Sequence, residues 1–442
     1  MPRAHAHAAI LSVGDELILG QTLDTNSPWL SQRLAALGIM PTRHATAPDD
    51  LAAQVQAFGD LARAADLLIC TGGLGPTADD LTRQALARAV GDSLVEDPIS
   101  LEQVRACFEA RGRPMPSINA IQALRPSGAR ALPNLFGTAP GLQAVWREGE
   151  HACDVFCLPG PPREMGPMFD AQVVPRLRPP PGTLLTRNLH TVGLGESDLA
   201  TRLGPLMARD RMPLVGTTAS GGIVSVRLRY RGPLPGEQAE ALMDRDEREV
   251  RRLAGPHVFA NGEATLGEAV VVQMRSEHRT LAVAESCTGG RGAGLVTDVA
   301  GASAVLRAGW VTYANESKVR DLGVPLELVS PGGPGAVSFE TASAMARCAL
   351  IRAGVTDALS VTGVAGPTGG SPEKPVGTVF VALASRRDAS ILTDTRRFQL
   401  LGERASIRAW SGTCALATLW MHLAGAPDTP LLRQVDRRLE RT

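Results

Sequence analysis

The segment Thr280-Leu281-Ala282-Val283-Ala284-Glu285-Ser286-Cys287-Thr288-Gly289-Gly290 decides the fold of the last third of the chain. It opens with a short apolar run, which is typical of a buried strand, and then passes through a serine into a turn that ends in two glycines. Glycine-rich turns of this kind allow backbone N–H groups to converge beside the preceding side chain. The segment therefore predicts a nucleophilic serine, Ser286, that carries its own anion site.

Two further stretches supply partners for this serine. The run Gly309 to Tyr313 reads as a strand that ends in a tyrosine, and Lys318 follows five residues later. A second glycine-rich loop, Thr362 to Gly370, follows the apolar run Ala358 to Val361. Together these stretches indicate catalysis and not a purely structural module.

The scarcity of lysine singles out Lys318. Only Lys318 and Lys374 are lysines among the 45 Lys and Arg residues, and Tyr313 is one of only two tyrosines. Arginine stays protonated, whereas a desolvated lysine can lose its proton and act as a base. A lysine kept at position 318 is therefore expected to serve through its amine. The alternatives are a solvated Lys318 beside a core Tyr313, and for Lys374 either a structural ion pair or a functional role.

Length and composition set the outer limits. A chain of 442 residues with 44% hydrophobic residues predicts two or three ordinary globular domains. The net charge is zero and no basic run stands out, so no nucleic-acid partner is expected. The apolar stretch from Ala8 to Val13 is too short for a signal peptide or a membrane span. We expect a cytoplasmic protein without a membrane partner.

The seven cysteines contain no Cys-x-x-Cys pair, and most lie in apolar runs. This pattern predicts buried, reduced thiols and no disulfide framework. Cys287 is the exception in position, because it follows Ser286 directly. It could be read as a nucleophile, but no histidine lies near it in sequence, and a packing thiol is the alternative.

The beginning of the chain predicts a second ligand site. Strands at Ala8 to Val13 and at Asp66 to Cys70 alternate with helices, which favours a parallel sheet covered on both faces. Ligands then bind beyond the carboxyl ends of the strands, where Thr71 to Asp80 forms a glycine-rich loop. Such loops bind phosphate through backbone N–H groups.

Carboxylates around that loop predict a metal. Asp79 and Asp80 lie in the loop itself, and Asp15, Asp24 and the pair Asp49-Asp50 lie in other loops. Carboxylates repel phosphate unless a divalent cation, such as Mg²⁺ or Co²⁺, stands between them, so Asp79 and Asp80 are candidate metal ligands. Helix capping is the alternative role for each of them.

Further loops are expected to complete the same pocket. These are Asn119 with Gln122, the stretch Gly137 to Gly141, and the proline-glycine loop Pro159 to Met165, which directs Arg163 or Glu164 towards a ligand. A simple chain reversal is the alternative. The residues predicted for this N-terminal site are Asp15, Asp24, Asn26, Gly72, Gly73, Asp79, Asp80, Asn119, Thr138 and Glu164.

The proline-rich stretch Arg178 to Gly182 marks a domain boundary. The alternating strand Ile223 to Tyr230 and the charged helix Glu237 to Leu253 follow it and indicate a small α+β domain. The predicted division is 1–176, 177–258 and 259–426, followed by a charged and flexible tail at 427–442.

The chain resembles the competence/damage-inducible protein A family over its whole length. The stretches that carry the resemblance are Gly14 to Glu16, Asp24 to Asn26, Thr71 to Asp80, Gly137 to Gly141, Pro159 to Met165, Glu285 to Gly290, Tyr313 to Lys318 and Thr362 to Gly377. The resemblance implies an N-terminal three-layer domain like molybdopterin-binding proteins, a small KH-like middle domain and a C-terminal α/β amidase domain.

The activity implied by the resemblance is hydrolysis of nicotinamide mononucleotide to nicotinate mononucleotide and ammonia, without a cofactor. Ser286 would attack the carboxamide, Lys318 would take its proton, and Tyr313 would orient or relay that proton. Backbone N–H groups from Cys287 to Gly290 would stabilise the oxyanion. The substrate phosphate would bind the residues Thr362, Gly363 and one of Arg404 or Arg408.

The same resemblance implies a metal-dependent ADP-ribose pyrophosphatase in the N-terminal domain and a homodimer. Two features depart from the family pattern. Ile121 stands where the pattern has a lysine, so a positive charge expected for the pyrophosphatase is missing. The segment Ser330 to Ser338 is longer and richer in glycine than expected, which predicts a longer loop.

The sequence is therefore compatible with three functions. The first is the amidase with small nucleotide substrates. The second is a pterin- or nucleotide-binding protein that acts through its first domain. The third is a non-catalytic partner in competence or recombination.

Overall fold

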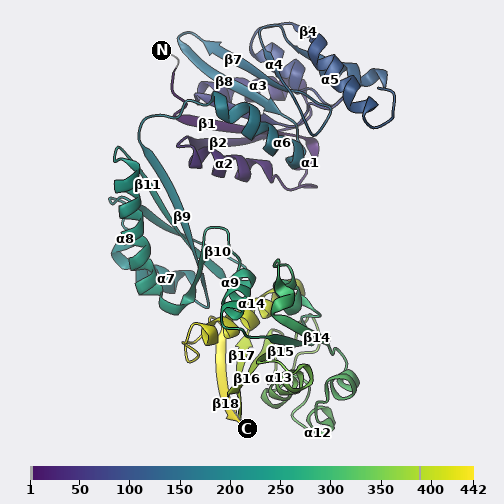
Figure 1. Cartoon of the computed structure of the whole chain (residues 1–442), viewed down its shortest axis with the longest axis vertical. Coiled ribbons are helices and arrows are strands. Elements are labelled where there is room, and N and C mark those ends of the chain that lie inside the picture. The colour runs from purple at the N-terminus through teal and green to yellow at the C-terminus, as the bar shows by residue number, and fades with distance from the viewer. Residues whose placement is uncertain (1–2, 388–389) are drawn as a thin grey trace. The chain divides into compact units, whose positions relative to one another are not determined.

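The computed structural model describes residues 3–387 and 390–442. They form two compact units, one of residues up to 186 with 230–239 and the other of 187–229 with 240–442 (Figure 1). Each unit contains a six-stranded sheet, and a four-stranded sheet lies mostly in the second unit. The α/β class expected from the sequence is confirmed.

The first unit is built on the sheet β2-β1-β3-β8-β7-β6. The first four strands in this order are parallel, and the last two are antiparallel to their neighbours. The strands are β1 (His7–Val13), β2 (Met40–Ala47), β3 (Leu67–Thr71), β6 (Arg130–Leu132), β7 (Gly141–Glu148) and β8 (His151–Leu158).

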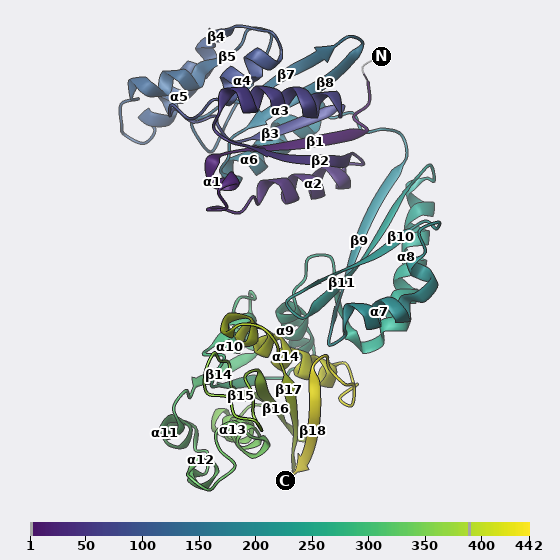
Figure 2. The ribbon, with the colours of Figure 1, turned by 180° about the vertical axis from the view of Figure 1, so that it is seen from behind.

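Helices cover both faces of this sheet. Leu30 and Leu34 of α2 pack with Ile10 and Ile69 on one face, and Phe58 of α3 packs on the other face. Figure 2 shows α3 and α4 on the side opposite α2. The helices are α1 (Asp15–Ile18), α2 (Asn26–Ala36), α3 (Leu51–Arg63), α4 (Thr82–Ala89), α5 (Pro98–Glu109) and α6 (Pro162–Met168), and two short strands, β4 (Leu94–Glu96) and β5 (Leu124–Pro126), pair separately. This is the expected three-layer arrangement.

Strand β2 was not predicted, and the apolar run at Asp66 was taken as the second strand. The reason lies in the exposure of β2, which is at the sheet edge and keeps Thr42, Arg43 and His44 exposed. An edge strand buries too little surface to require an apolar run, so its sequence carries a weak signal.

The middle of the chain forms the sheet β10-β11-β9-β12. Arg187 of β9 donates hydrogen bonds to Asp244 and Glu247 of α8, which fixes this helix against the sheet. The elements are β9 (Thr183–Val192), α7 (Glu196–Leu203), β10 (Leu214–Ser220), β11 (Ile223–Gly232), α8 (Gly236–Ala254) and β12 (Val258–Asn261). The small α+β domain expected here is present.

The last part of the chain forms the sheet β14-β13-β15-β16-β17-β18, in which the first three strands are parallel and the others antiparallel. The strands are β13 (Leu281–Glu285), β14 (Leu306–Val311), β15 (Asp357–Gly363), β16 (Thr378–Arg387), β17 (Ser390–Gln399) and β18 (Gln434–Arg441). Helices α9 and α14 lie on one face and α13 on the other. The helices are α9 (Leu266–Ser276), α10 (Arg291–Thr297), α11 (Asn315–Ser317), α12 (Leu326–Val329), α13 (Phe339–Ala353) and α14 (Arg404–Leu423).

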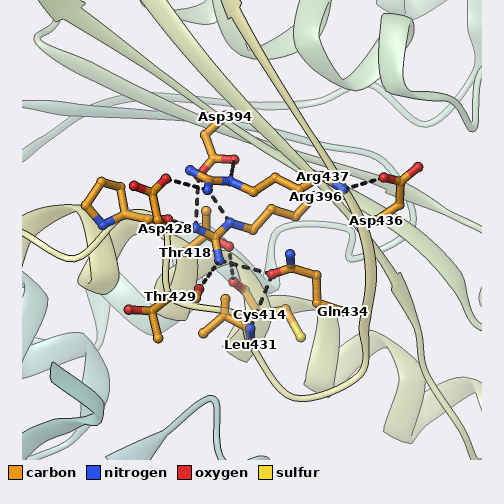
Figure 3. A network of polar contacts seen from close by, with 11 residues as sticks. Asp394, Arg396, Cys414, Thr418, Asp428, Thr429, Leu431, Gln434, Asp436 and Arg437 are labelled. Carbon is orange, nitrogen blue, oxygen red and sulfur yellow. Dashed lines mark hydrogen bonds and ion pairs between the residues drawn. The ribbon is translucent and has the colours of Figure 1, made fainter. Parts of the chain in front are cut away.

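The expected flexible tail at 427–442 is wrong. Residues Gln434–Arg441 form β18, which pairs antiparallel with β17 along the sheet edge. Figure 3 shows the polar network behind this pairing. Arg396 of β17 is fully buried and donates to Asp394 at 3.0 Å and to the carbonyl of Thr429 at 2.9 Å, and Arg437 of β18 donates to Asp394 at 2.7 Å. Two of the charges that suggested a solvated tail are instead paired with other elements, Arg437 with Asp394 of β17 and Arg438 with Glu340 of α13.

We expect Asp394→Ala to destabilise this domain by about 3 kcal/mol, because the buried Arg396 would lose its carboxylate partner. Chemical denaturation followed by tryptophan fluorescence measures the loss. Asp428→Ala is the matched control: Asp428 also pairs with Arg437, but its side chain is 84% exposed, so little change is expected. Equal effects of the two substitutions would contradict the structural role of the buried network.

Candidate active site

Three neighbouring parallel strands end at one edge of the C-terminal sheet. Glu285, the last residue of β13, is in register with Val311 of β14 and with Val361 of β15. The segments that follow these strands therefore lie side by side, which brings Ser286 together with the Thr312-Tyr313 and Thr362-Gly363 stretches. The carboxyl ends of parallel strands are a common location of ligand sites in α/β folds.

The structure places Ser286 beside Lys318. The Nζ atom of Lys318 lies 3.1 Å from Oγ of Ser286. Lys318 is 1% exposed and Ser286 is 9% exposed, so both groups are largely shielded from water. The alternative of a solvated lysine is therefore wrong.

Two backbone carbonyls hold the amine in place. Nζ of Lys318 donates to the carbonyl of Thr312 at 2.8 Å and to that of Tyr313 at 3.3 Å. A neutral amine has two N–H donors and one lone pair, so these two bonds leave the lone pair for the third direction, where Ser286 lies. Burial lowers the pKa of Lys318, which favours this neutral form.

The side chain of Tyr313 lies elsewhere. It is 60% exposed, and its hydroxyl accepts a hydrogen bond from Arg404 at 2.9 Å. Within the described residues no hydrogen bond joins this hydroxyl to Ser286 or Lys318. The carbonyl of Tyr313, and not its phenol, is the group in contact with the amine, because the side chain of a residue that follows an edge strand can turn to solvent.

The turn after Ser286 uses several of its own N–H groups. The N–H of Ser286 donates to the carbonyl of Val361, that of Gly289 donates to the carbonyl of Ser286, and that of Gly290 donates to the carboxylate of Glu285. In the part of the chain that the structure describes, the N–H groups of Cys287 and Thr288 have no such acceptor outside their own residues. The expected range of oxyanion donors, Cys287 to Gly290, thus narrows to two residues.

Arg408 and Arg404 both lie at this site, on the first two turns of α14. Arg408 donates to the carbonyls of Cys287 and Thr288, each at 2.9 Å. Arg404 donates to the carbonyl of Gly366 at 2.8 Å and to the hydroxyl of Tyr313. Arg408 therefore braces the nucleophile turn, whereas Arg404 lies at the exposed mouth of the site.

The second glycine-rich loop, Thr362 to Gly370, borders the site, but its first residues make contacts with other parts of the domain. The hydroxyl of Thr362 donates to the carbonyl of Ala336 at 2.7 Å, and a side chain at Gly363 would collide with the backbone of Thr378 and Val379. Lys374 donates to the carbonyl of Pro334 at 2.8 Å, within the long glycine-rich segment before α13. Lys374 thus holds a loop and forms no ion pair in the described structure.

Cys287 is buried and its thiol is held protonated. Burial raises the pKa of this thiol to about 11, so the thiolate needed for nucleophilic attack is scarce at neutral pH. All seven cysteines are free, as expected. The packing alternative for Cys287 fits these surroundings.

Sequence reasoning missed two residues of this site. Thr312 supplies the carbonyl that lies closest to the Lys318 amine. Because every residue has a backbone carbonyl, the residue type at this position does not indicate the role. Glu285 is 1% exposed, although it is an acid at the end of an apolar strand. A buried acid directly before the candidate nucleophile was a signal that could have been used.

The first unit contains a separate cavity of about 360 Å³ beyond the carboxyl ends of its strands. Of the predicted N-terminal site residues, it is lined by Gly72, Gly73, Asp79, Asp80, Thr138 and Glu164. Gln122 and Asp49, both expected around this loop from the sequence, also line the cavity, and so does Glu16.

Four predicted residues do not line the cavity, because each is engaged in folding a loop. Asp15 accepts from the N–H of Asp49, and Asn26 donates to the carbonyl of Gly160. Asn119 donates to Gln122 at 2.9 Å. Asp24 is partly buried, which opposes its ionisation, but hydrogen bonds from Ser27 and Ser12 outweigh burial and lower its pKa. Asp24 accepts from the N–H of Ser27 in the first turn of α2, which fits the helix-end role given as the alternative for the aspartates.

The cavity does not contain a preformed metal centre. Asp80 uses one carboxylate oxygen for the N–H of Gly75 and the other for the N–H of Thr77. The other expected metal ligand, Asp79, is exposed, and a hydrogen bond with the side chain of Thr77 in the same turn lowers its pKa. Among residues 3–387 and 390–442 no group of three His, Cys, Asp or Glu side chains could hold a metal ion. The divalent metal stays a prediction, and no chemical step is assigned to it.

Known families match each part of the chain. The probable molybdopterin binding domain matches residues 9–179, the damage-inducible protein CinA KH domain matches 186–260, and the CinA C-terminal domain matches 263–423. A putative competence-damage inducible protein of Symbiobacterium thermophilum is 43% identical over 435 residues, which cover 95% of this chain and 100% of that protein. The chain belongs to the CinA family. A CinA-like protein of Geobacter sulfurreducens is 42% identical over 95% of this CinA chain and 99% of its own length.

Solved structures of CinA proteins resemble part of this family member. The competence/damage inducible protein CihA from Agrobacterium tumefaciens is 40% identical, covers 36% of this chain and 93% of its own, and gives a TM-score of 0.33. The combination of a molybdopterin-binding-like domain, a KH-like domain and a CinA C-terminal domain, expected from the sequence, is confirmed. No helix among the described residues has the length and apolar character needed to cross a membrane.

Proposed function

We propose that the C-terminal domain is an amidohydrolase that converts nicotinamide mononucleotide to nicotinate mononucleotide and ammonia. The observation that supports this proposal is the buried pair of Ser286 and Lys318, whose Oγ and Nζ atoms lie 3.1 Å apart. A serine hydroxyl is a weak nucleophile until an adjacent base accepts its proton. A buried lysine with a lowered pKa is such a base.

The first half-reaction forms an ester. Oγ of Ser286 attacks the carboxamide carbon while its proton passes to Nζ of Lys318, and the tetrahedral oxyanion is stabilised by the N–H groups of Cys287 and Thr288. Lys318 then returns the proton to the leaving nitrogen. The carbon–nitrogen bond breaks, ammonia leaves, and the nicotinoyl group stays on Ser286.

The second half-reaction releases the acid. Lys318 takes a proton from water, the resulting hydroxide attacks the ester carbon, and the proton returns to Oγ of Ser286 as the ester bond breaks. The product is the nicotinate nucleotide, and the site is restored. Each step uses only the two side chains, the turn and water.

The substrate phosphate is proposed to bind Arg404 at the N-terminus of α14. This helix is 20 residues long, and both its N-terminus and Arg404 favour an anion. Arg408 contributes through the turn, because its Nε and Nη2 atoms already donate to the carbonyls of Cys287 and Thr288. The hydroxyl of Thr362 donates to Ala336 and so is less available to donate to a phosphate.

The test is ammonia release by the full chain with nicotinamide mononucleotide, with nicotinamide riboside and free nicotinamide as controls for the phosphate. We expect turnover of the mononucleotide and a much higher KM for the two smaller amides. If none of the three amides is hydrolysed, the amidase proposal is wrong, and a non-catalytic role in competence becomes the better interpretation.

A second proposal concerns the cavity of the first unit. We propose that it binds a nucleotide or a pterin, because a cavity of about 360 Å³ is lined by the backbone of Gly72, Gly73 and Gly75 beyond the strand ends. Ile121 supplies no charge for a pyrophosphate, so binding is proposed without hydrolysis. The ligand is proposed to bind whether or not a divalent metal is present.

We expect ADP-ribose or a pterin to raise the melting temperature of the first unit. A ligand at 100 times its Kd adds about 2.7 kcal/mol to the free energy of unfolding. Differential scanning fluorimetry with and without Mg²⁺ or Co²⁺ measures the shift and its metal dependence. Gly73→Ala is the matched variant, since a side chain there would collide with Thr82 and distort the loop. No shift with either ligand would rule out both ligand classes.

A further inference from the structure

Glu285 is a carboxylate with unusual surroundings. It ends the buried strand β13 directly before Ser286, and only 1% of it is exposed. A buried carboxylate is costly unless hydrogen bonds replace the lost water. Glu285 has three such bonds, all from backbone N–H groups: from Gly290 at 3.0 Å, from Gly292 at 3.1 Å and from Ala293 at 2.8 Å.

These bonds join the two ends of the nucleophile turn. One partner, Gly290, closes the turn with a positive φ of 95°, and the others belong to the first turn of α10. Gly292 approaches the carboxylate so closely that a Cβ there would lie 3.2 Å from Oε1. The carboxylate therefore accepts from N–H groups that α10 leaves without a partner inside the helix.

Arg408 holds the opposite side of the same turn. It donates to the carbonyls of Cys287 and Thr288, and in a trans peptide the N–H points away from the carbonyl that precedes it. The N–H of Thr288 is thus directed away from Arg408. With Glu285 on one side and Arg408 on the other, the turn is fixed by charged groups at both ends.

We infer that Glu285 is a positioning residue that orients the Cys287 and Thr288 N–H groups towards the oxyanion of the amidase reaction. It touches neither the substrate nor Lys318. Its three bonds fix the turn and occupy the N–H groups of Gly290, Gly292 and Ala293, whereas those of Cys287 and Thr288, directly after Ser286, have no backbone acceptor among the described residues. This inference rests on the proposed amidase function.

Glu285→Gln is the primary test. The glutamine amide accepts with its oxygen, but its NH₂ group faces backbone N–H groups, so at least one of the three bonds is lost. We expect kcat to fall about 100-fold, comparable to the loss of one oxyanion donor, while KM changes less than about threefold. Glu285→Asp keeps the charge and is expected to recover part of kcat.

Two readouts separate positioning from general damage. The pH at which kcat/KM rises is set by Lys318, so it should be the same in Glu285→Gln and in the wild type. Amide hydrogen exchange should accelerate in residues 286–297 and stay unchanged in other segments. Asp357→Asn is the matched control: Asp357 is also fully buried, but it starts β15 at the other end of the strand.

The outcomes distinguish this inference from the function on which it rests. Wild-type protein without ammonia release contradicts the amidase, yet faster exchange at 286–297 in Glu285→Gln still supports the positioning of the turn. Unchanged kcat, a shifted pH profile or exchange that accelerates equally in Asp357→Asn would each overturn the inference. If Glu285→Gln does not fold, Gly292→Ala, which crowds the same carboxylate, provides the second test.

Discussion

Replacing Ser286 with alanine is expected to abolish ammonia release from nicotinamide mononucleotide, with kcat reduced at least about 1,000-fold. Removal of a covalent nucleophile commonly lowers kcat by this factor or more, because the covalent intermediate can no longer form. Stability should change little, since the Lys318 amine keeps its two carbonyl acceptors, Thr312 and Tyr313. A fixed-time ammonia assay together with thermal unfolding measures both effects.

The control for this prediction is Ser317→Ala. Ser317 lies next to Lys318, but its hydroxyl bonds to Asp321 and not to the amine, so nearly full activity is expected. Cys287→Ser examines the neighbouring thiol, which burial keeps protonated. Full activity in Ser286→Ala, or loss of activity confined to Cys287→Ser, would show that another group attacks the substrate.

The central pair was predictable from composition because lysine is so rare in this chain. In an arginine-rich sequence, one of only two lysines placed after a strand predicts a role for its amine, and the structure places that amine 3.1 Å from Ser286. The orientation of Tyr313 was not predictable. Residue type indicates a phenol, but the described contact with the amine is made by the backbone carbonyl, which every residue has.

The fold was predictable where strands are buried and unpredictable where they lie at an edge. The runs at Ala8 and Leu281 are fully buried and appear as strands. Strand β18 carries charges of both signs on five of its residues, and its sequence therefore resembles a solvated tail. Its position depends on pairing with β17 and on the Arg396 network, which are contacts between distant segments.

The acids of the N-terminal loops illustrate a limit of motif reasoning. Asp24 and Asp80 were read as ligand-binding groups, but serine, threonine and backbone donors of their own loops surround them. An acid in a glycine-rich loop is equally suited to folding the loop and to binding a ligand. Asp80 lines the cavity, but both of its carboxylate oxygens accept from the loop, whereas Asp24 does not line it.

Lys318 yields the second prediction with a large expected effect. Lys318→Arg should lose at least about 100-fold in kcat, because a guanidinium stays protonated and cannot accept the serine proton. Lys318→Met should lose as much, since it fills the same space without a base. Lys374→Arg is the matched control at the other lysine of the chain, whose amine holds the carbonyl of Pro334, and full activity is expected there.

The pH dependence follows from the direction of the Lys318 pKa. Burial lowers it from its ordinary value of 10.5, so kcat/KM should rise with pH and level off once the folded-state amine is neutral, below pH 10.5. Between these two pKa values the unfolded chain binds a proton that the folded chain does not. The free energy of unfolding contributed by this group therefore rises with pH over that interval, and below it the buried charge destabilises the fold.

Activity and stability should consequently separate in Lys318→Met. At neutral pH this variant loses turnover, but its melting temperature is expected to equal or exceed that of the wild type, because folding no longer has to remove the proton that the Lys318 amine carries in the unfolded chain. Denaturation and kinetic measurements over the same pH range test both statements. Retained activity in Lys318→Arg would remove the base from the mechanism, and an Lys318→Met variant much less stable than wild type would show that the lysine holds the fold together instead.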